Sequence, residues 1–197
     1  MTPKREASRP QNAPRPGSGA IAWARRVPLA IRGACYYVVF LATALVAAPL
    51  LADALGARFL PWRLELGALR WPGWGLFAIC LASYTACSYW LMSRGRGAYV
   101  EFDPPERFVA DGPFRWSRNP IAACVLGMLL GEAVGLSSAG VLVLFLLAAP
   151  LAHLQVMCLE EPLLARRFGD SYARYLRRTP RWIPRPPRGR TESSRPS

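Results

Sequence analysis

The sequence predicts an all-α, polytopic membrane protein with about four transmembrane helices. Of its 197 residues, 52% are hydrophobic and only 19% are charged, whereas a soluble domain carries about a quarter charged residues. The formal net charge of +13 lies in the two ends, because residues 34–165 hold eight basic and nine acidic side chains. The chain is therefore a membrane protein or a very unusual globule, and the charge-free runs described next favour the membrane.

The two ends have the composition of disordered basic tails. Residues 1–32 and 185–197 are rich in Pro, Arg and Ser and contain no periodic apolar pattern. A cleaved signal peptide is the competing interpretation of the N-terminal region. However, the first charge-free run is twenty residues long and its basic lead exceeds thirty, and both are too long for a typical signal.

Three apolar regions follow the N-terminal tail. Residues 33–52 and 71–93 carry no charge, and each matches one bilayer crossing of about 20 residues. We therefore assign residues 33–93 to the first two transmembrane helices. The third region, residues 119–159, is twice as long, and its segment Gly135–Gly140 suits a reversal. It is expected to form a tight hairpin of two crossings.

The distribution of Lys and Arg predicts the orientation in the membrane. If the N-terminus is inside, the cytoplasmic segments hold 22 Lys and Arg and the outer segments hold 3. Cytoplasmic loops carry such an excess. We expect a multi-pass protein with both termini in the cytoplasm, in the inner membrane of a bacterium.

A different kind of helix is expected over residues 160–178. Pro162 suits its first turn, and Gly169 interrupts it. Aromatic and apolar side chains recur at helical spacing opposite five arginines, which predicts an amphipathic helix on the cytoplasmic membrane surface or folded over a site there. The apolar positions are Leu164, Phe168, Tyr172 and Tyr175, and the basic ones are Arg166, Arg167, Arg174, Arg177 and Arg178.

Three features within the spans could have a function. Small residues recur every four positions from Ala123 to Gly135, which suits either a helix packing face or a slot for a flat ligand. Glu132 lies beside this stripe, and a carboxylate inside a span costs at least ~2.5 kcal/mol, so it marks a functional or a strongly hydrogen-bonded position. The single histidine, His153, is more typical of a satisfied core residue. The five cysteines show no metal-ligand spacing, so no metal site is predicted.

Polar segments bracket the hairpin. Residues 111–120 precede it and Glu160 and Glu161 follow it, so both must return to the same membrane face. Pro120 and Pro162 each open a helix whose free N–H groups suit anions. A polar cofactor could be held between the two segments, although two carboxylates before a proline are also an ordinary helix start.

A series of short motifs runs through the second half of the chain. They are Gly95-Arg96-Gly97, Asp103-Pro104-Pro105, Gly112-Pro113-Phe114-Arg115, Arg118-Asn119-Pro120, Glu160-Glu161-Pro162-x-Leu164, Phe168-Gly169-x-x-Tyr172-x-x-Tyr175 and Pro180-Arg181-x-Ile183-Pro184. Together they resemble the isoprenylcysteine carboxyl methyltransferase family, which groups with the integral-membrane phospholipid methyltransferases. The resemblance covers residues 72–187.

The resemblance implies that residues 94–184 form a methyltransferase-like region that binds S-adenosylmethionine, and that a lipid substrate enters from the bilayer. Catalytic roles fall to Arg118 and Glu160, and a substrate contact falls to Ala122. Glu132 is the other candidate substrate contact, because it is a carboxylate inside a span. The implied cofactor contacts are Val109, Phe114, Arg115, Asn119, Pro120, Glu160 and Glu161.

Two positions depart from the usual residues of the family. Phe114 and Ala122 each replace a common Tyr, and at Ala122 one wall of the site is smaller as a result. Asn119 stands where many members have His and others have Asn, so a polar contact survives.

The expected function is methyl transfer to a lipophilic acceptor, which is an isoprenylcysteine-like carboxylate, a phospholipid or another hydrophobic molecule. The expected partners are this substrate and membrane lipids. A catalytically silent protein of the same fold and a nicotinamide-dependent membrane reductase are the alternatives, although a GxGxxG fingerprint is lacking. Specific nucleic-acid binding is not expected, because the arginines flank membrane spans. The sequence leaves open the acceptor and the oligomeric state.

Overall fold

The computed structural model describes residues 27–60, 64–96 and 106–186. Within these ranges the chain consists of helices and loops and contains no strand, which confirms the predicted all-α class. Residues 1–26 and 187–197 of the two predicted tails lie outside the described ranges, as do Gly97 and the Asp103-Pro104-Pro105 motif. Three helical segments are long and apolar enough to cross a membrane, namely Leu29–Phe59, Gly67–Gly95 and Ala139–Arg178.

The first segment is one continuous helix in three parts. It consists of α2 (Leu29–Ala42), the π-helical turn η1 (Thr43–Ala47) and α3 (Ala48–Phe59). It begins directly after Pro28, four residues before the charge-free run that predicted it. The wide turn η1 precedes Pro49, whose ring lacks an N–H and would clash with a carbonyl of the preceding turn in a regular helix.

Two further helices, α4 and α5, follow along the chain. A 3₁₀ turn, η2 (Gly67–Leu69), leads into α4 (Arg70–Gly95). After the segment that contains the 3₁₀ turn η3 (Gly112–Arg115), α5 (Pro120–Gly135) begins at its proline. The helix α6 (Ala139–Gln155) then starts only four residues after α5 ends, within the Gly135–Gly140 segment in which the sequence predicts a reversal.

This reversal is held by side chains on both sides. Ser138 caps α6, because its Oγ accepts a hydrogen bond from the Val141 N–H at 3.2 Å. On the other side, Arg70 Nε donates to the Gly135 carbonyl at 3.0 Å, so a cation sits at the C-terminal end of α5, where the helix dipole favours it. The start of α4 and the end of α5 are thereby fixed together.

The stripe of small residues on α5 is a packing face against α4. A Cβ atom on Gly131 would lie 2.8 Å from both the Gly73 carbonyl oxygen and the Phe77 nitrogen. Likewise, a Cβ atom on Gly135 would lie 2.7 Å from the Trp74 ring. Because α4 fills the space over these glycines, this face of α5 offers no slot for a ligand, and the packing interpretation is correct.

The first helix completes the bundle by packing on α4, α5 and α6. A Cβ atom on Gly56 of α3 would lie 2.7 Å from the Gly140 Cα of α6, so these two backbones are in direct contact. Deeper in the bundle, Leu45, Tyr84 and Met128 form the buried core. These contacts join α2 and α3 to the hairpin and to α4.

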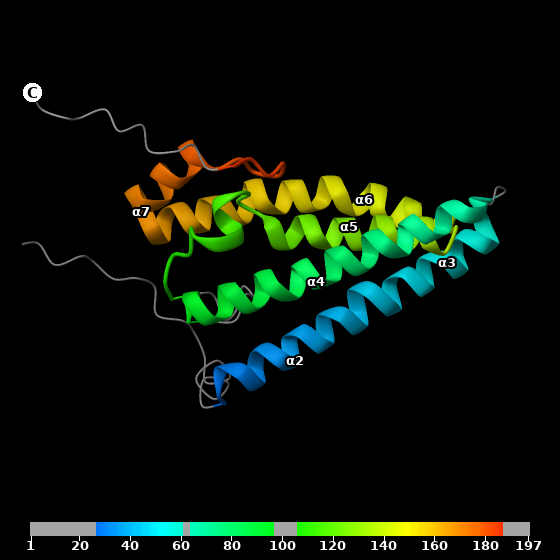
Figure 1. The fold of residues 1–197 in the computed structure, drawn as a ribbon, viewed down its shortest axis with the longest axis horizontal. Coiled ribbons are helices and arrows are strands. Elements are labelled where there is room, and N and C mark those ends of the chain that lie inside the picture. Colours follow the sequence, from blue (N-terminus) through cyan, green and yellow to red (C-terminus); the bar gives the residue numbers. More distant parts are fainter. Residues whose placement is uncertain (1–26, 61–63, 97–105, 187–197) are drawn as a thin grey trace, which may run out of the picture.

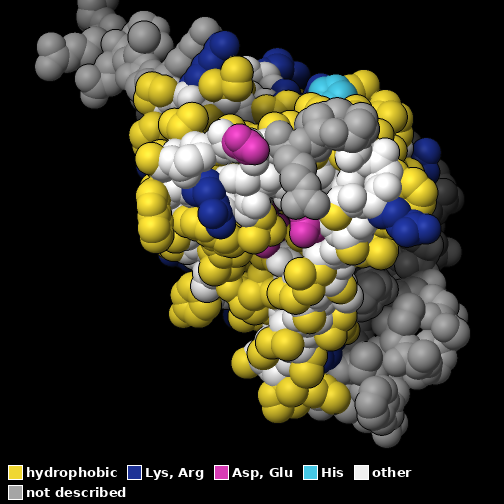
Figure 2. Space-filling model, turned by 90° about the vertical axis from the view of Figure 1, so that its right-hand side faces the viewer, with side chains coloured by type: hydrophobic (Ala, Val, Ile, Leu, Met, Phe, Trp, Pro, Cys, Tyr) yellow, Lys and Arg dark blue, Asp and Glu magenta, His cyan; other side chains and the backbone are white. Residues whose placement is uncertain are grey.

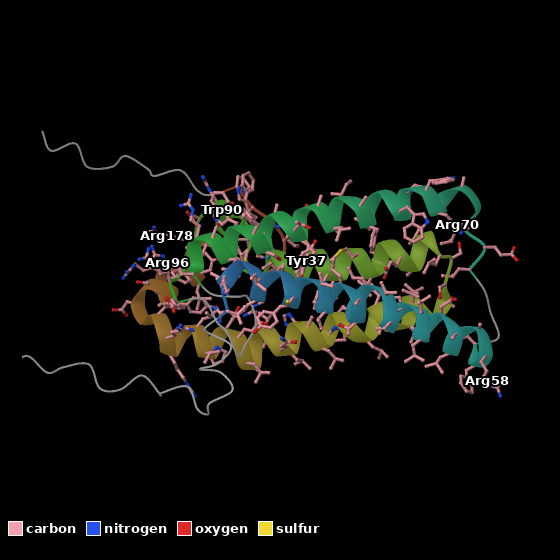
Figure 3. The ribbon with its side chains drawn as sticks, turned by 90° about the horizontal axis from the view of Figure 1, so that it is seen from below. Tyr37, Arg58, Arg70, Trp90, Arg96 and Arg178 are labelled. Atoms are coloured by element: carbon pink, nitrogen blue, oxygen red, sulfur yellow. The ribbon has the colours of Figure 1, made fainter. Side chains whose placement is uncertain are left out.

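The helices run alternately up and down the bundle (Figure 1). Arg58 and Arg70 lie together at one end, and Arg96 and Arg178 lie at the other (Figure 3). We call these the Arg58 end and the Arg178 end. Figure 2 looks onto the Arg58 end and shows many hydrophobic side chains on the flanks of the bundle. Exposed apolar side chains such as Leu51, Ile79 and Leu151 suit a lipid environment.

The last helix continues from α6 at the Arg178 end. The π-helical turn η4 (Val156–Glu160) connects α6 to α7 (Glu161–Arg178) and, like η1, precedes a proline, here Pro162. Gly169 has φ 50° and ψ −127°, so it breaks α7 into two helical pieces at the residue where the sequence predicts an interruption. The second piece buries Tyr172 and Tyr175 and leaves the arginines exposed.

Candidate functional site

The loop that precedes α5 is anchored to the end of α4. Asp111 accepts hydrogen bonds from Trp90 Nε1 and from Arg94 Nη1, each at 3.2 Å. Gly112 follows with φ +55°, and a Cβ atom there would collide with the Trp90 ring. Only glycine fits this position without strain, and the turn η3 that it opens carries Phe114 into the interior, where the residue is 8% exposed.

An aromatic cluster covers the same loop from the side of α7. The ring of Phe108 contacts the rings of Phe168, Tyr172 and Tyr175 at centroid distances of 5.2–5.8 Å. Tyr175 also donates a hydrogen bond from its hydroxyl to the Phe114 carbonyl at 2.6 Å. The apolar face of α7 therefore folds over this loop, residues 106–119, which we call the site loop. This is one of the two positions that the sequence allows for the helix.

The chain beyond α7 returns along the start of α5. We call residues 179–185 the strap. Its contacts with the site loop are backbone-directed: the Arg118 N–H donates to the Pro180 carbonyl at 2.8 Å, and the Arg185 N–H donates to the Trp116 carbonyl at 3.1 Å. Ser117 Oγ adds hydrogen bonds to the carbonyls of Arg181 and Trp182 at 3.1 and 3.2 Å. Two backbone hydrogen bonds and the hydroxyl of Ser117 thus hold the strap against residues 116–118.

A charge network joins the strap to both segments that bracket the hairpin. Glu161 accepts from Arg118 Nη1 at 2.8 Å, and Arg181 donates to its two oxygens at 2.8 and 2.9 Å. The side chains of Glu161 and Arg118 are only 15% and 16% exposed. Hydrogen bonding to Glu161 raises the pKa of Arg181 above its ordinary value. Arg118 is fixed further by donating from Nε to the Thr179 carbonyl at 2.8 Å.

Glu160 and Glu161 have different environments although they are adjacent. Glu160 is half-buried at the end of η4 and accepts a hydrogen bond from Gln155 Nε2 at 3.2 Å. Successive residues of a helix point about 100° apart, so the two carboxylates face different directions. Glu161 accepts its hydrogen bonds from Arg118 and Arg181, whereas Glu160 accepts one from Gln155.

The structure brings together most of the residues that the sequence predicts for the site. Those near the Arg178 end are Val109, Phe114, Arg115, Arg118, Asn119, Pro120, Ala122, Glu160 and Glu161. Val109 and Phe114 are buried, whereas Arg115 is exposed. Glu132 is not among them: it is buried near the other end of α5, about 18 Å along the helix from Pro120 at 1.5 Å per residue.

Sequence reasoning missed several residues that build the site. Arg181 lies in a motif that carried part of the resemblance, but no role was assigned to it. Ser117, Trp182 and His153 had no role either, and Trp182 Nε1 donates to His153 Nδ1 at 2.9 Å. His153 is therefore a satisfied residue, as its sequence context favours. The motif around Arg181 was the one available signal, since contacts to backbone carbonyls leave no mark in a sequence.

A family model described as phospholipid methyltransferase matches residues 71–171. The chain belongs to this family. The resemblance to the isoprenylcysteine and phospholipid methyltransferases that the motifs indicate is thereby confirmed. No curated protein and no solved structure matches the chain significantly. Membership makes the chain a membrane methyltransferase in general terms, which agrees with its three long apolar helices.

The phospholipid methyltransferase match covers a definite part of the fold. It begins in the first turn of α4 and ends in α7, two residues after the break at Gly169. All predicted site residues, from Val109 to Glu161, fall inside it. The second half of α7 and the strap lie beyond it, although the strap makes hydrogen bonds with residues 116–119 of the site loop.

Proposed function

We propose that the protein is a membrane-embedded methyltransferase that moves a methyl group from S-adenosylmethionine to a lipophilic acceptor taken from the bilayer. The observation that carries this proposal is the convergence of the site loop and the Glu160 and Glu161 pair at one end of a bundle with hydrophobic flanks. The family match supports the reaction class. Such a bundle offers a polar site to a substrate that stays dissolved in lipid.

The proposed topology has four crossings with the Arg178 end in the cytoplasm. At 16 residues, α5 spans about 24 Å, less than the ~30 Å of hydrocarbon, but its contact with α4 covers one face along its length. The arginine count supports a cytoplasmic Arg178 end. In this orientation the exposed arginines of α7 lie against the anionic leaflet, while Tyr172 and Tyr175 face the site loop.

The residues at the Arg178 end fit a methyl donor that has aromatic, anionic and cationic parts. Val109 and Phe114 supply buried apolar surface. Glu160 and Arg115 lie at this end as one negative and one positive group, and such a pair suits the amino and carboxylate groups of an amino acid. When bound, S-adenosylmethionine supplies an electrophilic methyl group on a sulfonium. The protein's contribution is to orient the reactants and to exclude water.

The surroundings of the site favour a carboxylate acceptor, of the isoprenylcysteine type, over a phospholipid amine. A carboxylate is already a nucleophile, whereas an ammonium group must first lose a proton to a base. Glu161 is held by two guanidinium groups, and the Nδ1 of His153 accepts a hydrogen bond from Trp182. Neither is placed to serve as that base.

The role proposed for Glu160 predicts a loss of cofactor affinity on neutralisation. Glu160→Gln is expected to weaken binding of S-adenosylmethionine by about 10-fold or more, because a hydrogen bond to a charged group contributes about 1.5–3 kcal/mol. Calorimetry on the detergent-solubilised protein measures this. Glu65→Gln is the matched control, since Glu65 is exposed near the opposite end. Equal affinities for Glu160→Gln and the parent protein would refute the role.

The reaction itself predicts a labelled lipid. Purified protein incubated with membrane extract and methyl-labelled S-adenosylmethionine is expected to transfer label to the lipid fraction. Base should then release the label, because a methyl ester hydrolyses and a methylated amine does not. Base-stable label would instead indicate a phospholipid amine. If no fraction carries label, the protein is a silent member of the family, an outcome that the small Ala122 would explain.

A further inference from the structure

The strap occupies the side chains that the resemblance assigns to the cofactor. Arg118 donates hydrogen bonds from Nε to the Thr179 carbonyl and from Nη1 to Glu161. Asn119 donates from Nδ2 to the Arg181 carbonyl at 3.2 Å. These donors point toward the protein's own C-terminal segment, so their first effect is to fix the strap against the start of α5.

The strap also has an attachment on the opposite side. Trp182 Nε1 donates to His153 Nδ1 at 2.9 Å, and their rings lie 6.0 Å apart, tilted by 32°. Both residues are half-buried. His153 belongs to α6, which connects directly to the helix that carries Glu160. The pair therefore ties the strap to the second arm of the hairpin, while its backbone bonds tie it to the loop before the first arm.

We propose that the strap is a fixed wall of the methyl-donor site and that His153 and Trp182 are positioning residues that hold it in place. This inference rests on the function proposed above. Neither residue has to touch the donor: their hydrogen bond fixes the distance between α6 and the strap, and with it the placement of Arg118 and Asn119. The strap lies outside the family match, and its motif Pro180-Arg181-x-Ile183-Pro184 belongs to the resemblance without a role having been assigned to it.

The test separates the hydrogen bond from the bulk of the ring. His153→Leu removes the acceptor, whereas His153→Asn keeps a side-chain acceptor close to the position of Nδ1. Trp182→Phe removes the donor and keeps an aromatic ring, although a smaller one. Leu154→Ala, at an exposed neighbour on the same helix, is the matched control. Two measurements are made on each variant. Calorimetry gives its affinity for S-adenosylmethionine, and hydrogen exchange is followed at the amides of Arg118 and Arg185, whose hydrogen bonds join the strap to the site loop.

His153→Leu and Trp182→Phe are each expected to weaken binding about three- to tenfold, the equivalent of one neutral hydrogen bond, and to speed exchange of both amides. His153→Asn is expected to restore most of the affinity. The double variant His153→Leu with Trp182→Phe should be no weaker than either single variant, because both remove the same bond.

The outcomes distinguish the two proposals. If the parent protein fails to bind S-adenosylmethionine, the proposed function fails. If the parent binds and His153→Leu and Trp182→Phe bind equally well, with unchanged exchange, the positioning role is overturned. Additive losses in the double variant, or no recovery with His153→Asn, would also overturn it, since the hydrogen bond would then not be the cause.

Discussion

Replacement of Glu161 by glutamine is expected to destabilise the protein by about 3 kcal/mol or more. The substitution leaves Arg118 and Arg181 without a counter-charge in a largely buried position, and breaking one side of such a pair costs about 3–5 kcal/mol. The strap and the start of α7 lose their common anchor at the same time. Thermal unfolding of the detergent-solubilised protein measures the change.

Arg94→Gln is the matched control for this prediction. It breaks the ion pair with Asp111. The side chains of Arg94 and Asp111 are 57% and 54% exposed, and exposed pairs contribute at most about 1 kcal/mol. The two ion pairs lie on opposite sides of the same loop. If Arg94→Gln and Glu161→Gln lowered the stability by similar amounts, burial of the Glu161 network would contribute nothing to the stability of the fold.

The second large effect is expected at the contact between α4 and α5. Gly131→Ala places a methyl group 2.8 Å from the Gly73 carbonyl oxygen and from the Phe77 nitrogen. Both neighbours are backbone atoms, so the helices themselves must separate, and overpacking of this kind costs about 1–3 kcal/mol or more. Lower yield of folded protein and a lower thermal midpoint in detergent are the expected results.

Gly75→Ala provides the comparison for Gly131→Ala. Gly75 also lies in a membrane helix, but nothing lies within 4 Å of a Cβ atom built there. Alanine in a helix is favoured over glycine by about 0.5–1 kcal/mol, so this variant should be at least as stable as the parent. If Gly131→Ala behaved like Gly75→Ala, close backbone approach would not be what holds α4 against α5.

The sequence predicts those parts of the fold that depend on short-range pattern. Hydrophobic runs and the glycines at 135 and 140 are local, and they place the reversal of the hairpin within its segment. The packing face of α5 follows from a four-residue spacing, but the spacing alone does not distinguish a helix from a flat ligand as the partner. The contact of Gly131 with Gly73 makes that distinction, because it joins residues far apart in the chain.

The candidate site is predictable in its members and less so in their roles. Topology alone brings the loop before α5 and the pair Glu160 and Glu161 to one end. The hydrogen-bond partners of Glu160 and Glu161 differ because the two carboxylates point in different directions. That difference depends on where Arg118 and Arg181 lie, which the sequence does not give. The strap is held mainly through its own backbone carbonyls, which every residue has. Glu132 was grouped with the site by its cost in a span, although it lies at the other end of α5.

The π-helical turn η4 sets the phase of the first piece of α7, as far as the break at Gly169. Its wide turn holds one residue more than a regular turn, so this piece is rotated by about 100° from the direction that an unbroken continuation of α6 would give. In that rotated position Phe168, the last residue before the break, meets Phe108. Without the extra residue, a basic edge of this piece would turn toward the loop instead. The spacing before Pro162 therefore directs the apolar side of this piece toward the protein and its charged side toward the membrane surface.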